Sequence, residues 1–165
     1  MRKTLEAISL GALAVLAFLT WSALYGPNHL RDKIPTHFDM AGHVNGWGTS
    51  SSLVLLPVVA LGVYLLLSAI VRFPAFFNYP VAVTDQNRPR LQALACDMIS
   101  WIKAEMVCLF AWIQRMTIHA ARMPDGGFLP TSGFMVGTLG LVALLLGTVG
   151  WFIVAMLRAA QAQSS

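Results

Sequence analysis

The chain has 165 residues, of which 57% are hydrophobic and only 11% are charged. A soluble domain of this size has too small an interior for so many apolar side chains, and a disordered chain would contain far fewer, so both classes are excluded. The formal net charge of +4 comes from 11 basic residues spread along the chain, which excludes a Lys/Arg-rich nucleic-acid-binding protein and indicates charges arranged by membrane topology.

Four segments are long and apolar enough to cross the hydrocarbon core of a bilayer, for which a helix needs about 20 residues. They cover residues 5–25, 53–73, 91–119 and 134–157. The composition and these segments predict an all-α integral membrane protein, a bundle of four transmembrane helices that forms a single membrane domain over residues 1–165.

The first segment follows Arg2 and Lys3, as the apolar core of a signal peptide would. Its apolar run is longer than such a core and ends without an Ala-x-Ala cleavage site, so we expect an uncleaved helix. Basic residues near helix ends favour the cytoplasmic side. Six of them fall on the side of the termini and four on the side of the first loop, which predicts cytoplasmic termini: Arg2, Lys3, Arg72, Arg88, Arg90 and Arg158 against Arg31, Lys33, Arg115 and Arg122.

The loop of residues 26–52 is longer than a simple helical hairpin requires. Residues 34–38 alternate between apolar and polar side chains, as a short half-buried strand does. Residues 39–42 can form a turn, and Asn45-Gly46 suits a tight turn that needs a positive φ. Thr49 or Ser50 is placed to cap the second helix. We expect a folded extracytoplasmic loop, and the pattern favours a short β-hairpin within it.

Two motifs of this loop resemble a known family. They are Ile34-Pro35-Thr36-His37-Phe38 and, after Gly42, Gly46-Trp47-Gly48, set between two apolar helices. The pair resembles domain-of-unknown-function family 1648 of bacterial membrane proteins, which is also found in the N-terminal part of SdpI-type toxin-immunity proteins. The resemblance covers the first helix, the loop and the second helix, and it implies a multi-pass protein of the bacterial cytoplasmic (inner) membrane and an immunity-like role.

The loop also contains side chains that can bind a metal or a partner. His37, Asp39 and His43, with His29 nearby, offer imidazole and carboxylate ligands, but their spacing matches no established metal motif. Asp39 can equally serve the turn, and His37 can hydrogen-bond the loop backbone. A structural loop, a metal site and a recognition surface thus stay open. We predict no metal and no cofactor, and we take His37, Phe38, Asp39 and Trp47 as candidate ligand- or partner-binding residues.

The third apolar segment carries a polar stripe. Its seven members fall within about 80° of one another on a helical wheel, which places them on the inner side of the bundle. Lys103 and Gln114 lie on roughly the opposite side. The members of the stripe are Asp97, Trp101, Glu105, Cys108, Trp112, Arg115 and His119.

Glu105 lies near the expected bilayer centre, where an ionised carboxylate costs about 2.5–3.5 kcal/mol on insertion scales. Such residues are functional candidates by default, so Glu105, Arg115 and His119 join the candidate ligand- or partner-binding residues. Two interpretations of the stripe stay open. It is either a buried network that holds the third helix to its neighbours, or a site that titrates protons or gates a ligand.

Small residues follow one side of the fourth segment, where they allow close helix packing. They are Gly133, Gly137, Gly140, Ala143, Gly147 and Gly150. Packing within the bundle and a homo-oligomer or partner interface both explain them. Cys96 and Cys108 lie 12 residues apart in one apolar segment and fit neither a disulfide framework nor a zinc motif.

The sequence contains no recognisable nucleophile–base set and no glycine-rich phosphate loop, so we predict no catalytic residues and no enzymatic activity. The expected function is a sensing, binding or immunity-type membrane module that recognises a membrane protein or peptide through the 26–52 loop. Three alternatives stay open: a small transporter or proton-coupled subunit using the polar stripe, a metalloenzyme using the loop histidines, and an accessory subunit of a larger membrane complex.

Overall fold

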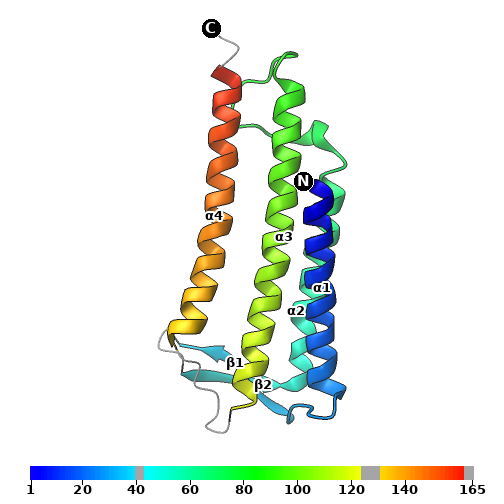
Figure 1. Cartoon of the computed structure of the whole chain (residues 1–165), viewed down its shortest axis with the longest axis vertical. Coiled ribbons are helices and arrows are strands. Elements are labelled where there is room, and N and C mark those ends of the chain that lie inside the picture. Colours follow the sequence, from blue (N-terminus) through cyan, green and yellow to red (C-terminus); the bar gives the residue numbers. More distant parts are fainter. Residues whose placement is uncertain (40–42, 124–130, 162–165) are drawn as a thin grey trace.

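The fold is a helical bundle with a small sheet across one end (Figure 1). The computed structural model of the chain describes residues 1–39, 43–123 and 131–161. The helices are α1 (Arg2–Tyr25), α2 (Leu55–Ile70), α3 (Arg88–Ala121) and α4 (Thr131–Gln161), with short 3₁₀ helices at η1 (Ser50–Val54) and η2 (Pro74–Phe76). The strands β1 (Lys33–Phe38) and β2 (Val44–Thr49) form the antiparallel sheet. The four predicted helical segments are therefore confirmed as helices.

Three helical segments are long and apolar enough to cross a membrane. They are Arg2–Tyr25, Ser50–Ile70, which joins η1 to α2, and Gly133–Gln161. Much of their surface consists of exposed apolar side chains such as Phe18, Leu66 and Leu146, which suits contact with lipid. The remaining expected span, α3, is less apolar than these three segments, because polar and charged residues recur along it.

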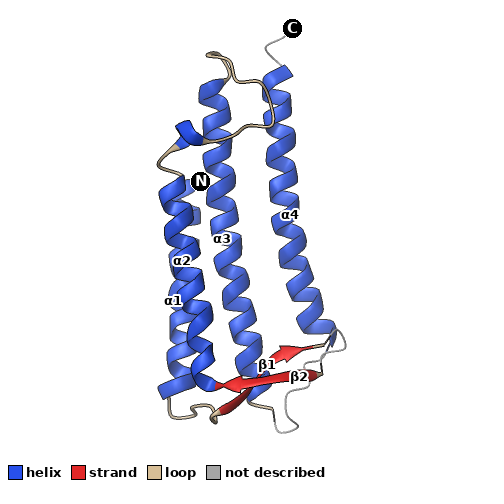
Figure 2. Ribbon diagram, turned by 180° about the vertical axis from the view of Figure 1, so that it is seen from behind, coloured by secondary structure: helices blue, strands red, loops and turns tan. Residues whose placement is uncertain are grey.

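The helix α3 is the central helix of the bundle. It packs against α1 and α2 on one side and against α4 on the other (Figures 1 and 2). With 34 residues it is about 51 Å long at 1.5 Å per residue, so it exceeds a 30 Å hydrocarbon core. The two termini lie toward one end of the bundle and the β-hairpin lies at the other.

Two apolar clusters hold the ends of the bundle together. At the hairpin end, Ala23 of α1, Ile34 of β1, Leu53 of η1 and Ile118 of α3 are buried against one another together with Leu30. At the terminal end, the cluster joins α3 to α4 and to the connector between α2 and α3; its buried members are Leu91, Ala95, Met156 and Ala159. The sheet is thus fixed to the helices through Ile34, which is only 1% exposed.

The β-hairpin confirms the strand predicted at 34–38 and corrects the predicted turn. Asn45 and Gly46 lie inside β2, and Gly46 pairs with His37 across the sheet. A Cβ added to Gly46 would lie 2.8 Å from the His37 Cβ, so a close strand approach, and no tight turn, explains this glycine. The connection is closed by Asp39 and His43, since the Asp39 N–H donates to the His43 carbonyl at 2.9 Å. The predicted turn residues 40–42, Gly42 included, lie outside the described residues.

The start of the second helix differs in detail from the expected cap. Thr49 occupies the N-cap position of η1 but makes no side-chain capping bond to the helix backbone. Its hydroxyl is hydrogen-bonded to the Ser51 hydroxyl at 2.7 Å, and the Ser52 hydroxyl donates to the Thr49 carbonyl. A serine-rich 3₁₀ turn therefore links the sheet to α2.

Candidate functional site

The polar stripe of α3 lines two pockets. The terminal pocket has a volume of about 620 Å³ and contains the stripe members Asp97, Trp101 and Glu105. Its other lining residues come from the N-terminus, α3 and α4: Met1, Leu94, Ala143, Leu144, Gly147, Thr148, Trp151 and Phe152. The hairpin pocket, of about 540 Å³, is lined by the other four stripe members, Cys108, Trp112, Arg115 and His119, together with residues of α1 and α4. The predicted common side of all seven residues is therefore confirmed, and both pockets contact α4.

Glu105 is buried in the wall of the terminal pocket, with 7% of its surface exposed. Its Oε1 accepts a hydrogen bond from the Thr148 hydroxyl of α4 at 2.6 Å. Its Oε2 is also buried, and among the described residues it has no hydrogen-bond partner. An unpartnered buried carboxylate oxygen is costly. The other unpartnered buried side-chain oxygen among the described residues is the neutral Gln114 Oε1, on the opposite side of α3.

Asp97, the stripe residue nearest the start of α3, forms an ion pair with a residue of α1. The Arg2 side chain forms an ion pair with Asp97 and also donates to the Ala93 carbonyl at 3.1 Å. This contact connects the first turn of α1 to α3. The Asp97 carboxylate therefore has a cation from another helix, which sequence spacing alone did not reveal.

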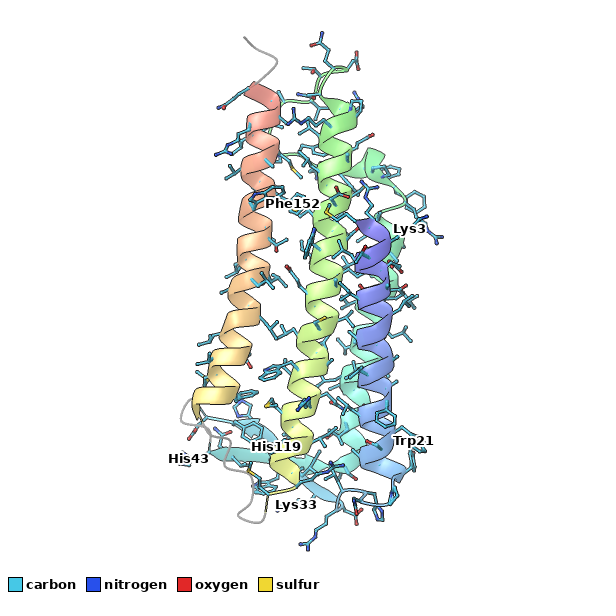
Figure 3. The ribbon with its side chains drawn as sticks, in the orientation of Figure 1. Lys3, Trp21, Lys33, His43, His119 and Phe152 are labelled. Atoms are coloured by element: carbon cyan, nitrogen blue, oxygen red, sulfur yellow. The ribbon has the colours of Figure 1, made fainter. Side chains whose placement is uncertain are left out.

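The hairpin pocket is basic at its outer edge. Arg115, His119 and Arg122 line it, and no ion pair of these three side chains is formed within the described part of the chain. Figure 3 shows His119 at the hairpin end of α3, near the strands. Deeper in the same pocket, the Trp112 indole N–H donates to the Thr138 hydroxyl at 3.2 Å, which ties α3 to α4.

The four candidate residues of the loop lie on or next to β1 and β2. His37 Nδ1 is hydrogen-bonded to Asn45 Oδ1 across the sheet, and Asp39 Oδ1 accepts from the His43 N–H at 2.9 Å. The Phe38 ring contacts Phe134 of α4, with ring centroids 6.1 Å apart. Trp47 is 48% exposed and has the Lys33 ammonium 5.4 Å from its ring centroid.

Among the described residues, the loop residues and the stripe residues do not line a common pocket. None of His37, Phe38, Asp39 and Trp47 lines either pocket. No group of three or more histidine, cysteine, aspartate or glutamate side chains in the described residues is arranged to hold a metal ion. The molecule thus has an exposed hairpin surface and two pockets along α3 as separate candidate sites.

The sequence analysis placed Lys103 on the other side of α3 but did not predict the polar cluster that it forms there. Lys103, which is 4% exposed, donates to the Glu6 carboxylate of α1 and to the Ser68 hydroxyl of α2, the latter at 3.0 Å. The Tyr64 hydroxyl also donates to Glu6, and the Lys103 ammonium lies 4.7 Å from the centroid of the Tyr64 ring. The signal in the sequence was Glu6, the single acidic residue of α1.

Gln114 lies on the same side of α3, nearer the hairpin. Its side chain is fully buried, and its Nε2 donates to the Thr20 hydroxyl of α1 at 2.8 Å and to the Leu53 carbonyl at 3.0 Å. The predicted position of Lys103 and Gln114 opposite the stripe is therefore confirmed. These two side chains join the three helices α1, α2 and α3.

Comparison with known families gives one match, to the first part of the chain. Residues 12–61 match the family described as "Domain of unknown function (DUF1648)". This segment, 50 of the 165 residues, is similar to that family. It includes the hairpin and both of its motifs, while the terminal pocket is built from residues outside it. No curated protein and no solved structure gave a significant match to the chain.

Proposed function

We propose that this protein is a non-enzymatic, multi-pass protein of the bacterial cytoplasmic membrane that binds a membrane protein or peptide partner at its hairpin end. The observation that carries this proposal is the anchored hairpin. Ile34 and Pro35 of β1 are buried against the bundle, while His37 and Trp47 are exposed beside them. An exposed tryptophan on a fixed scaffold is a typical anchor of a binding surface.

The charge around the hairpin favours a partner with acidic groups. Arg31 and Lys33 flank or begin β1, and Arg115 and Arg122 lie at the adjacent end of α3. Complementary charge accelerates association and selects partners. The described acidic residues of this end are fewer, namely Asp32 and Asp39.

The proposed topology places this surface outside the cytoplasm. In this arrangement α3 crosses the membrane as well, so that the protein has four spans. Its neighbours shield it from lipid on two sides, and its polar residues can therefore face other helices. Six basic residues on the terminal side against four on the hairpin side favour cytoplasmic termini. The resemblance to SdpI-type proteins supports an immunity-like role for a surface in this position.

The experiment compares His37→Ala and Trp47→Ala with Trp21→Ala, which removes an exposed tryptophan from α1 outside the hairpin. Membranes from cells expressing each full-length variant are solubilised, and proteins that co-purify are identified by mass spectrometry. We expect both hairpin variants to insert normally and to lose the partner that the wild type and Trp21→Ala retain. Retention of the same partner by both hairpin variants would contradict the proposal.

A further inference from the structure

One buried hydrogen-bond acceptor in the wall of the terminal pocket has no donor among the described residues. Glu105 Oε2 is buried and lacks a hydrogen-bond partner among the described residues, whereas Oε1 is bound by Thr148. The nearby basic side chains are already engaged: Arg2 pairs with Asp97, and Lys103 pairs with Glu6 on the opposite side of α3. A ligand that brings positive charge or a donor to Oε2 would offset the cost of this orphaned atom.

The rest of the pocket is apolar and aromatic. Trp101 of α3 and Trp151 and Phe152 of α4 contribute ring surfaces, and the last two rings contact edge to face with centroids 4.7 Å apart. Figure 3 shows Phe152 on the side of α4 toward α3. The volume of about 620 Å³ is in the range of pockets that take small organic ligands.

These features favour a positively charged ligand over an anion. Asp97 is neutralised by Arg2, whereas no basic side chain of the described residues pairs with the Glu105 carboxylate, which therefore disfavours an anion in the pocket. Aromatic faces attract cations in a site from which water is excluded. An organic cation with an apolar body satisfies the carboxylate and the aromatic walls together, whereas a small hydrated ion would leave most of the wall without contact.

We propose that the terminal pocket binds a hydrophobic organic cation, an amine or quaternary ammonium with an apolar body, whose charge lies at Glu105 and whose body contacts Trp151 and Phe152. This site lies outside residues 12–61 and no hairpin residue lines it, so it is independent of the proposed partner surface. It is formed mainly between α3 and α4.

The test uses tetraphenylphosphonium and tetraphenylborate, which have the same shape and opposite charge. Equilibrium dialysis measures the binding of each ion to the detergent-purified full-length chain, with protein-free micelles as the blank. We expect saturable binding of the phosphonium and at least tenfold weaker binding of the borate. Equal binding of the two ions would overturn the proposal, because it would show that apolar contact alone determines binding.

The variant Glu105→Gln keeps the size of the side chain and removes its charge. We expect it to weaken phosphonium binding at least tenfold. The matched control Asp85→Asn removes one carboxylate from the connector before α3 and should leave binding unchanged. Wild-type affinity in Glu105→Gln, or an equal loss in Asp85→Asn, would overturn the assignment of the charge to this pocket.

A second pair of variants tests the wall independently of Glu105 and remains decisive if Glu105→Gln does not fold. Trp151→Leu removes an aromatic face of the pocket, and Trp21→Leu removes an exposed tryptophan of α1 outside it. We expect severalfold weaker phosphonium binding in the first and unchanged binding in the second. Unchanged binding in Trp151→Leu, or an equal loss in Trp21→Leu, would place the site elsewhere and overturn the proposal.

Discussion

Lys103 and Glu105 are two residues apart on α3, and their side chains point about 200° away from each other around the helix. Lys103 therefore binds Glu6 between α1, α2 and α3, while Glu105 lies against Thr148 of α4. Helical periodicity predicts this division from the sequence. The partners could not be predicted, because they depend on which helices become neighbours and at what height.

Removing the Lys103 ammonium should destabilise the bundle. The variant Lys103→Met leaves the Glu6 carboxylate without its cation, and half-exposure of Glu6 limits the expected loss to about 1–2 kcal/mol. Thermal unfolding in detergent, followed by loss of the monodisperse elution peak, measures the change. The double variant Lys103→Met with Glu6→Gln should recover part of the loss; a double variant less stable than the sum of both single changes would contradict the pairing.

Gln114 gives a second prediction at the level of single residues. Gln114→Ala removes two hydrogen bonds and leaves a cavity among α1, η1 and α3, so we expect a loss of about 1–3 kcal/mol. The same unfolding measurement tests it against Gln92→Ala, a change near the less buried start of α3. Similar unfolding temperatures for the two variants would show that the buried bonds contribute little.

At the level of helices, α4 packs mainly against α3. Its glycines differ in how close a neighbouring side chain lies. A Cβ at Gly137 would overlap the Trp112 ring, whereas Gly133, Gly140, Gly147 and Gly150 have open space around an added Cβ. The sequence predicted a small-residue face, and packing within this chain explains one glycine of it. A homo-oligomer through the remaining positions stays a prediction.

The contrast between two glycines of α4 tests this packing directly. Gly137→Ala should force Trp112 to move and lower the unfolding temperature, because the ring is also bonded to Thr138. Gly140→Ala meets no atom within 4 Å and should leave stability unchanged or raise it by up to about 1 kcal/mol through helix propensity. A more stable Gly137→Ala variant would show that the two helices are not in close contact there.

For the whole molecule, composition was enough to predict a membrane protein and four helices, since about 20 apolar residues are needed for each span. The strand at 34–38 was predictable from its alternation. The position of Asn45 and Gly46 inside β2 could not be predicted, because the same dipeptide suits both a tight turn and a close approach of two strands. The separation of the hairpin from the two pockets along α3 also required the three-dimensional arrangement, since sequence distance does not report it.

The topology makes a prediction at this scale. With the native cysteines replaced by serine, a cysteine introduced as His43→Cys, an exposed position, should react in intact cells with a membrane-impermeant maleimide. A cysteine introduced as Arg158→Cys, near the opposite end, should react only after the membrane is opened. Reaction of both or the reverse pattern would contradict cytoplasmic termini and an external hairpin.

The central claim is that the hairpin surface contacts a partner, and site-specific photo-crosslinking in living cells tests it most directly. Benzoylphenylalanine in place of Trp47, which is 48% exposed, is compared with the same residue in place of Trp21, which is 58% exposed and lies on α1. We predict a discrete crosslinked species of higher mass from position 47 that is absent from position 21. No crosslink at position 47, or the same species from both positions, would contradict partner binding at the hairpin.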